Sequence, residues 1–89
     1  VEDEASIVKR DENSWLIDAQ YTFADFCKYF DINFSLVDNT INFNTLGGLL
    51  LEELKHMPHA GEKVKWRNFI FEVVDMDGTR IDKLMVSKV

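Results

Sequence analysis

The sequence predicts a small α+β domain, with an antiparallel sheet of about five strands and two helices packed on it. Three observations predict this fold: two segments with apolar side chains at helical spacing, alternating apolar and polar residues on both sides of them, and a hairpin signal near the end of the chain. The 89 residues make about one small domain, and 46% hydrophobic with 12% aromatic residues is the composition of a folded chain.

Two short strands are predicted at the start of the domain, over residues 6–10 and 14–19, with turn chemistry between them. Residues 1–5 are acidic and are interpreted as a tail or the end of a linker, which leaves residues 6–89 as the domain. Trp15 lies on the second strand and is either an exposed stacking platform or a core anchor. The core anchor is favoured because buried tryptophans commonly anchor half-buried strands.

The first helix is predicted to begin at Thr22, whose hydroxyl can accept the backbone N–H of Asp25. Its buried stripe follows the i, i+3, i+4, i+7 pattern and consists of Phe23, Phe26, Cys27 and Phe30. Cys27 could be a nucleophile only with a nearby base and some exposure. Its place in the stripe favours a small buried hydrophobic residue instead.

The second helix is predicted to begin near Thr45, with Asn44 as its cap, after a packed, irregular loop over residues 31–44. Pro58 is expected to end this helix, because its ring cannot continue the hydrogen-bond ladder. The expected buried stripe consists of Leu46, Leu49, Leu50, Leu54 and Met57.

Gly47 and Gly48 in the first turn of this helix cost about 1 kcal/mol each relative to alanine, so something should offset them. One interpretation is a cradle of bare backbone N–H groups for an anion. The other is a helix start pressed against another element, with no room for a Cβ atom. Close packing is favoured, because the segment lacks the nearby Lys, Ser or third Gly of a phosphate site.

The last third of the chain is predicted to be β, with strands over residues 63–66, 69–75 and 79–89. Arg67 and Asn68 form a tight turn between the first two. Asp77-Gly78 is the strongest hairpin signal, because a type I′ turn needs a positive φ at both central residues. A shift in the apolar phase of the last strand predicts a β-bulge near Asp82 and Lys83.

Two groups of side chains invite a metal interpretation. His56 and His59 with Glu52 could ligate zinc, but Pro58 separates the histidines, which favours surface residues at a helix end. The acidic residues Asp75, Asp77 and Asp82 do not match the ligand spacing of a calcium loop. We therefore expect no catalytic, cofactor-binding or metal-binding residues.

The charge balance disfavours nucleic acid and anionic membrane surfaces, because ten Lys and Arg face sixteen Asp and Glu for a net charge of −6. The single cysteine fits a reducing compartment. No run approaches the roughly 20 apolar residues of a membrane span, and the acidic start is unlike a signal peptide. The chain opens with Val1 and is interpreted as a piece of a longer protein.

An ordered set of motifs over residues 7–86 resembles the transporter-associated domain of CorC/HlyC-type proteins. The segment 11–19 is similar to the opening hairpin of that family, and Thr45-Leu46-Gly47-Gly48-Leu49-Leu50 resembles its most characteristic motif. The other matching motifs follow in the order of the family: Pro58, Gly61-Glu62, Phe71-Glu72-Val73 and Asp77-Gly78-Thr79-Arg80-Ile81. One departure is Asn68, where the family often carries Gly; Asn tolerates a positive φ, so the turn should survive.

The resemblance implies a non-catalytic accessory domain on the cytoplasmic side of a membrane-associated parent. Such parents resemble magnesium and cobalt efflux proteins, carry a CBS pair and often a membrane domain, and many have a hemolysin label. The domain is expected to modulate transport through contacts with those domains or with a second copy of itself, without direct membrane contact. No family motif marks a catalytic residue.

The resemblance also leaves alternatives. The family fold is akin to one half of a flavin-binding dehydrogenase domain, so a flavin- or adenine-nucleotide-binding module competes with the accessory domain. Fold kinship is a weak reason to expect a ligand, and the net charge of −6 disfavours a pyrophosphate. FAD is therefore conceivable by kinship only, and no cofactor is expected. A secreted toxin is a third interpretation, suggested by the hemolysin label.

Overall fold

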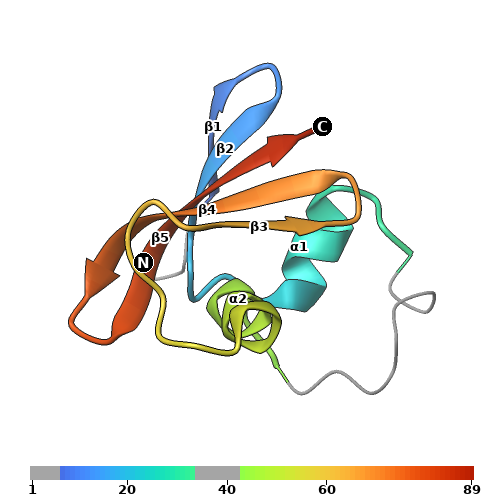
Figure 1. The fold of residues 1–89 in the computed structure, drawn as a ribbon. Helices are drawn as coiled ribbons and strands as arrows, with labels where there is room; N and C mark the ends of the chain where they lie inside the picture. Colours follow the sequence, from blue (N-terminus) through green and yellow to red (C-terminus); the bar gives the residue numbers. More distant parts are fainter. Residues whose placement is uncertain (1–6, 34–42) are drawn as a thin grey trace, which may run out of the picture.

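The computed structural model describes residues 7–33 and 43–89, which form five strands and two helices (Figure 1). In chain order the elements are β1 (Ile7–Asp11), β2 (Ser14–Asp18), α1 (Phe23–Tyr29), α2 (Leu46–Leu54), β3 (Lys63–Trp66), β4 (Phe69–Asp77) and β5 (Arg80–Lys88). This confirms the α+β class. The expected tail over residues 1–5 and most of the expected loop over residues 31–44 lie outside the described residues.

The five strands form one antiparallel sheet in the order β1-β2-β5-β4-β3, and both helices lie against one face of it (Figure 1). The last strand of the chain is therefore the central one. Strand β4 is interior, as the two apolar faces of its sequence predict, since it pairs with β3 on one side and β5 on the other.

The inner face of the sheet carries a row of apolar side chains across four strands. Trp15 pairs with Val86, Val86 with Phe71, and Phe71 with Val64. Trp15 is only 5% exposed. Its ring packs edge-on against that of Phe30, with the two ring centroids 4.7 Å apart. The core-anchor interpretation of Trp15 is therefore confirmed, and the stacking platform is wrong.

Helix α1 covers this row with its aromatic stripe. Thr22 caps the helix as predicted, and its hydroxyl accepts the backbone N–H of Asp25 at 3.1 Å. Phe26 is fully buried, and its ring centroid lies 5.3 Å from that of Phe69 and 5.5 Å from that of Phe71. Burying one such side chain is worth roughly 1.5–3 kcal/mol, so the stripe fixes α1 on the sheet.

Helix α2 ends earlier than the sequence predicts. Lys55 adopts a left-handed conformation with φ 59° and closes the helix, with its backbone N–H donating to the carbonyl of Leu51. Met57 consequently leaves the buried stripe and is 56% exposed, which corrects that prediction. Lys55 therefore ends the helix before Pro58 is reached, which corrects the expected end at Pro58.

The hairpin between β4 and β5 is shifted by one residue from the predicted turn. Asp77 pairs with Arg80, so Gly78 and Thr79 are the two central residues. Gly78 alone has a positive φ, 65°, which is the pattern of a type II′ turn rather than the expected type I′. The turn before β4 is corrected similarly, since Arg67 and not Asn68 has the positive φ, 56°.

The predicted bulge near Asp82 is confirmed. Asp75 pairs with Lys83 and Met76 with Ile81, which leaves Asp82 as the extra residue on β5. Its carbonyl is turned out of the β4 ladder and accepts the backbone N–H of Ala19 at 2.9 Å. The bulge thus ties β5 to the segment that follows β2, where a pocket lies.

Candidate functional site

The start of α2 is docked on the segment that follows β2. Thr22 and Thr45 form an isolated antiparallel bridge. Around it, the N–H of Phe23 donates to the carbonyl of Asn44 at 2.7 Å, and the N–H of Leu46 donates to the carbonyl of Tyr21 at 3.0 Å. Two segments far apart in the sequence are therefore held together by backbone hydrogen bonds at this junction.

The first backbone N–H groups of α2 all donate to acceptors within the chain. Besides Leu46, the N–H of Gly47 donates to the carbonyl of Ala19 at 2.9 Å, and that of Gly48 to the hydroxyl of Thr45 at 3.2 Å. The cap is therefore Thr45 and not the expected Asn44. The anion-cradle interpretation of the glycine pair is wrong, because a cradle needs N–H groups that are free to donate.

The two glycines are instead sites of close approach, as favoured by the sequence. A Cβ atom on Gly48 would lie 2.8 Å from the Cβ of Phe43, and one on Gly47 would lie 3.3 Å from both the Cβ and the carbonyl oxygen of Ala19. A side chain at Gly48 would therefore force Phe43 to shift, and one at Gly47 would press tightly on Ala19. The close approach of the helix start accompanies the helix-propensity cost of the glycine pair.

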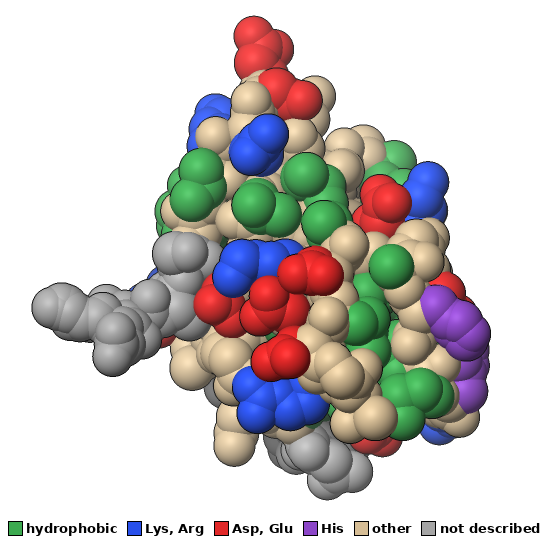
Figure 2. Space-filling view, turned by 90° about the vertical axis from the view of Figure 1, so that its left-hand side faces the viewer, with side chains coloured by type: hydrophobic (Ala, Val, Ile, Leu, Met, Phe, Trp, Pro, Cys, Tyr) green, Lys and Arg blue, Asp and Glu red, His purple; other side chains and the backbone are tan. Residues whose placement is uncertain are grey.

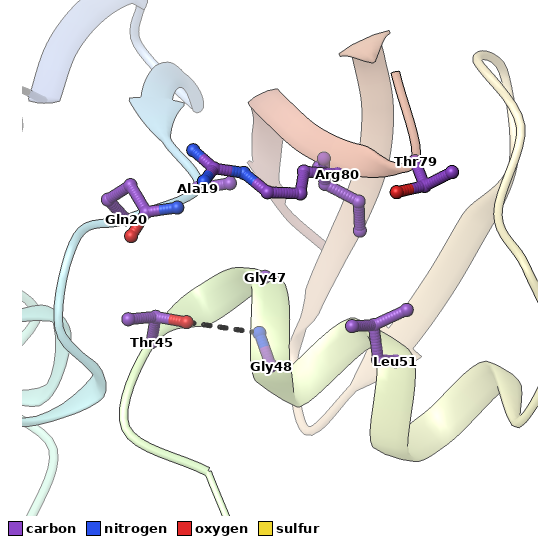
Figure 3. A pocket seen from close by; sticks show the side chains of 9 residues that line it. Ala19, Gln20, Thr45, Gly47, Gly48, Leu51, Thr79 and Arg80 are labelled. Carbon is purple, nitrogen blue, oxygen red and sulfur yellow. Dashed lines mark hydrogen bonds between the residues drawn. The ribbon is translucent and has the colours of Figure 1, made fainter. Parts of the chain in front are cut away.

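A pocket of about 200 Å³ opens beside this junction (Figure 3). Three segments line it: residues 19–20 after β2, residues 79–81 at the β4–β5 hairpin, and residues of α2 with its cap. Leu51 and Ile81 make part of its wall apolar, while Gln20, Thr45 and Thr79 bring polar groups. The pocket is smaller than the roughly 300–1,000 Å³ of typical small-molecule sites.

Arg80 is the only charged residue among the nine that line the pocket. The side chain of Arg80 extends along the pocket toward Gln20 (Figure 3). Within the part of the chain that the structure describes, this guanidinium has no hydrogen bond or ion pair. The pocket therefore presents an unneutralised positive charge next to apolar wall.

The two histidines lie on the loop after α2 and contact a different carboxylate from the one considered in the sequence. The Nε2 of His56 lies 2.8 Å from the Oε2 of Glu62, and the backbone N–H of His59 donates to Oε1 of the same carboxylate at 2.8 Å. This hydrogen bond holds the pKa of His56 above its usual 6.5 and the pKa of Glu62 below its usual 4.5. Glu62, rather than Glu52, organises this loop.

The His56–Glu62 pair predicts a pH window for its contribution to folding. The part due to His56 is present below pH 6.5 and is lost as the pH rises through its raised pKa. The part due to Glu62 is present above pH 4.5 and is lost as the pH falls through its lowered pKa. An NMR titration of the imidazole protons should give His56 a pKa above 6.5 that Glu62→Gln returns toward 6.5.

Glu53→Gln is the matched control, since Glu53 is an exposed glutamate on α2 that makes no hydrogen bond to His56 in the structure. It should leave the raised pKa of His56 in place. An unchanged His56 titration in Glu62→Gln would contradict the assignment.

The remaining candidate groups have structural places. Cys27 is 1% exposed, and burial raises the pKa of its thiol, so little reactive thiolate forms near neutral pH. The interpretation of Cys27 as a small buried hydrophobic residue is therefore confirmed. Within residues 7–33 and 43–89 no three His, Cys, Asp or Glu side chains are grouped as a metal site would need. Neither helix there has the length and apolar character that a membrane span requires.

Sequence reasoning did not identify Gln20, Leu51 or Arg80 as members of one site. They come from three separate segments, and only the fold brings them together. One signal in the sequence could have indicated the site: Arg80 comes directly after the hairpin turn. A residue at that place is held in position by the pairing of β4 with β5. Of the residues in the motifs named from the sequence, seven line the pocket: Ala19, Thr45, Gly47, Gly48, Thr79, Arg80 and Ile81. Trp15 and Leu46 are core residues.

The family model described as "Transporter associated domain" (CorC_HlyC) matches residues 8–89. The polyamine export protein of Escherichia coli is 40% identical over 86 residues, which are 97% of this chain and 19% of that protein. The chain thus spans about a fifth of the length of this curated relative.

Solved structures show the same fold. The transporter-associated domain of a Xylella fastidiosa hemolysin is 31% identical, with a TM-score of 0.80 over 97% of this chain and 98% of that one. A Neisseria meningitidis region named for its association with an Mg²⁺ and Co²⁺ transporter is also 31% identical, with a TM-score of 0.81 over 93% of this chain and 98% of that one.

Proposed function

We propose that this chain, which belongs to the CorC/HlyC transporter-associated domain family, is a non-catalytic accessory domain that regulates a longer parent transporter through domain contacts. The observation that carries the proposal is length. The chain is 40% identical to a polyamine export protein over 86 residues but covers only 19% of that protein, so the transport path of a similar parent would lie in the other four-fifths.

The cargo we propose for the parent is a cation. Polyamine export is the name of the relative at 40% identity, and Mg²⁺ and Co²⁺ appear in the name of the structural relative at 31% identity. Both kinds of cargo carry positive charge. The higher identity makes a polyamine the first cargo to assay and Mg²⁺ the second. In the proposed parent, this domain lies on the cytoplasmic side beside a CBS pair.

The non-catalytic role is supported by the chemistry of the pocket. Its hydroxyl groups belong to Thr45 and Thr79, and none of the nine lining residues is a His, Asp, Glu, Lys or Cys that could act on them as a base. Arg80 stays protonated and does not serve as a general base. The buried thiol of Cys27 lies outside the pocket lining.

The surface supports protein contacts. Large apolar side chains are exposed at several places, among them Val8 at 49%, Leu51 at 47% and Val74 at 43%. Figure 2 shows one face on which hydrophobic side chains lie next to mixed acidic and basic ones. These side chains offer apolar surface to a protein partner, whereas nucleic acid binding favours a concentrated basic area. Export by the parent with and without this domain tests the proposal.

The competing proposal is a flavin- or adenine-nucleotide-binding module, and the described pocket disfavours it. The pocket of about 200 Å³ is smaller than typical ligand sites, and the N–H groups at the start of α2 already have acceptors. We expect FAD titrated into the purified protein to keep the fluorescence of free FAD. Quenching that saturates at about micromolar FAD, which corresponds to a binding free energy of about −8 kcal/mol, would favour the module.

A further inference from the structure

The pocket combines one unneutralised cation with an otherwise uncharged lining. Arg80 has no ion pair within the described residues, and the other eight lining residues carry no charge. We propose that the pocket is a docking socket for a single carboxylate side chain, Asp or Glu, presented by another part of the parent protein. This inference rests on the proposed function, because it names the group through which the domain contact is made.

The chemistry of the lining fits a carboxylate on a short aliphatic stem. A guanidinium presents two parallel N–H donors that match the two oxygens of a carboxylate. The amide of Gln20, toward which Arg80 extends, can donate a further hydrogen bond (Figure 3). Leu51 and Ile81 provide apolar surface for the methylene groups of an Asp or Glu.

Size and donor count separate this occupant from a phosphate ligand. About 200 Å³ suits one side chain and is below the range of nucleotide-sized sites. A phosphate held at a helix start needs free N–H groups, and those of Gly47 and Gly48 donate to Ala19 and Thr45. The helix terminus therefore contributes shape to the socket and does not contribute anion-binding donors.

The charge of the whole chain argues for one carboxylate rather than an acidic surface. The net charge is −6, so an extended acidic partner would be repelled. A single Asp or Glu within a neutral or basic surface gains the contact with Arg80 without that repulsion. Screening over about 8 Å at physiological salt keeps the attraction local to the pocket.

Amide hydrogen exchange on the full parent tests the socket. Docking should slow exchange of residues 77–81 by about tenfold or more relative to the isolated 89-residue chain, because it covers the hairpin that carries Arg80. Arg80→Gln removes the charge and keeps a polar side chain. In the parent it should return exchange of this segment to within about twofold of the isolated chain, since charge-assisted contacts are the stronger ones.

Arg10→Gln is the matched control, since Arg10 is exposed on β1 and does not line the pocket. It should leave the slow exchange of the parent unchanged. Replacing the parent's Asp and Glu residues by Asn and Gln should then reveal one position that reproduces Arg80→Gln.

Each other outcome overturns a defined statement. If no segment of this domain exchanges more slowly in the parent, the proposed function fails together with the socket. If slowing occurs only away from residues 77–81, the domain contact stands and the socket fails. If residues 77–81 exchange as slowly in the parent carrying Arg80→Gln as in the unaltered parent, the proposal that a carboxylate binds Arg80 is wrong. If slowing appears in the isolated chain as its concentration rises, the occupant is a second copy of the chain.

Discussion

Gly48→Leu is expected to lower the free energy of unfolding of the domain by about 1–3 kcal/mol, the usual cost of overpacking. A Cβ atom at this position would lie 2.8 Å from the Cβ of Phe43, and that atom is fixed directly to the backbone. Helix propensity alone would favour Leu over Gly by somewhat less than 1 kcal/mol, so the sign of the effect distinguishes close packing from propensity. Urea denaturation of the purified chain measures it.

Glu52→Leu is the matched control, because it introduces the same side chain into the same helix at an exposed position. Its effect should stay within about 0.5 kcal/mol, as is usual for exposed sites. Equal denaturation midpoints for the two variants would show that the start of α2 has room to move. The glycine pair would then need another explanation.

Local patterns predicted the elements of this fold well, because those elements are specified by neighbouring residues. The hydroxyl of Thr22 caps α1 as its sequence position predicts, and the aromatic stripe led by Phe23 and Phe26 is buried. Trp15 and Cys27 also lie in the core, as their places in a strand and a stripe indicate. In each case the signal is hydrophobic periodicity or a cap within a few residues.

Predictions failed where contacts between distant segments decide the outcome. The turn that follows β4 is centred on Gly78 and Thr79, because the register of β5 places Arg80 opposite Asp77. The N–H of Gly47 is satisfied by the carbonyl of Ala19, 28 positions earlier. No local pattern contains these partners, so the anion cradle and the type I′ turn could not be rejected from the sequence.

The pocket shows the same limit at the level of function. Gln20 and Leu51 look ordinary in the sequence, and Arg80 is known there only as part of a motif. Their juxtaposition depends on the bulge at Asp82 and on the bridge between the segments of Thr22 and Thr45. The family motif around Gly47 was noted for the resemblance and not as a pocket, yet three of its residues line the pocket. It marks the close approach that forms the frame of the pocket.

Removal of residues 7–89 from the parent is expected to change export or its regulation by about 5-fold or more while export itself persists. An accessory domain acts on a transporter only through contacts that differ between its states, and such couplings are typically 1–3 kcal/mol, or about 5–150-fold. The measurement is export of a radiolabelled polyamine, and separately of Mg²⁺, from cells that express whole or truncated parent at matched membrane levels.

Two point variants make the deletion interpretable. The parent carrying Gly48→Leu should shift toward the truncated phenotype, because the clash of the added side chain with Phe43 weakens the fold that carries every contact of the domain. The parent carrying Glu52→Leu should export like wild type. A truncation effect without this difference would mean that length or membrane insertion, and not a folded domain, is responsible.

The result that would refute the accessory role is specific. If truncated and whole parent export at the same rate and respond alike to cargo concentration, the domain has no differential contact with the transport states, however well it folds. If truncation abolishes all export at matched membrane levels, the domain is part of the transport path and not a modulator. A partial, regulated change is expected instead, because a domain that contacts the transport states differently shifts their populations without forming the path itself.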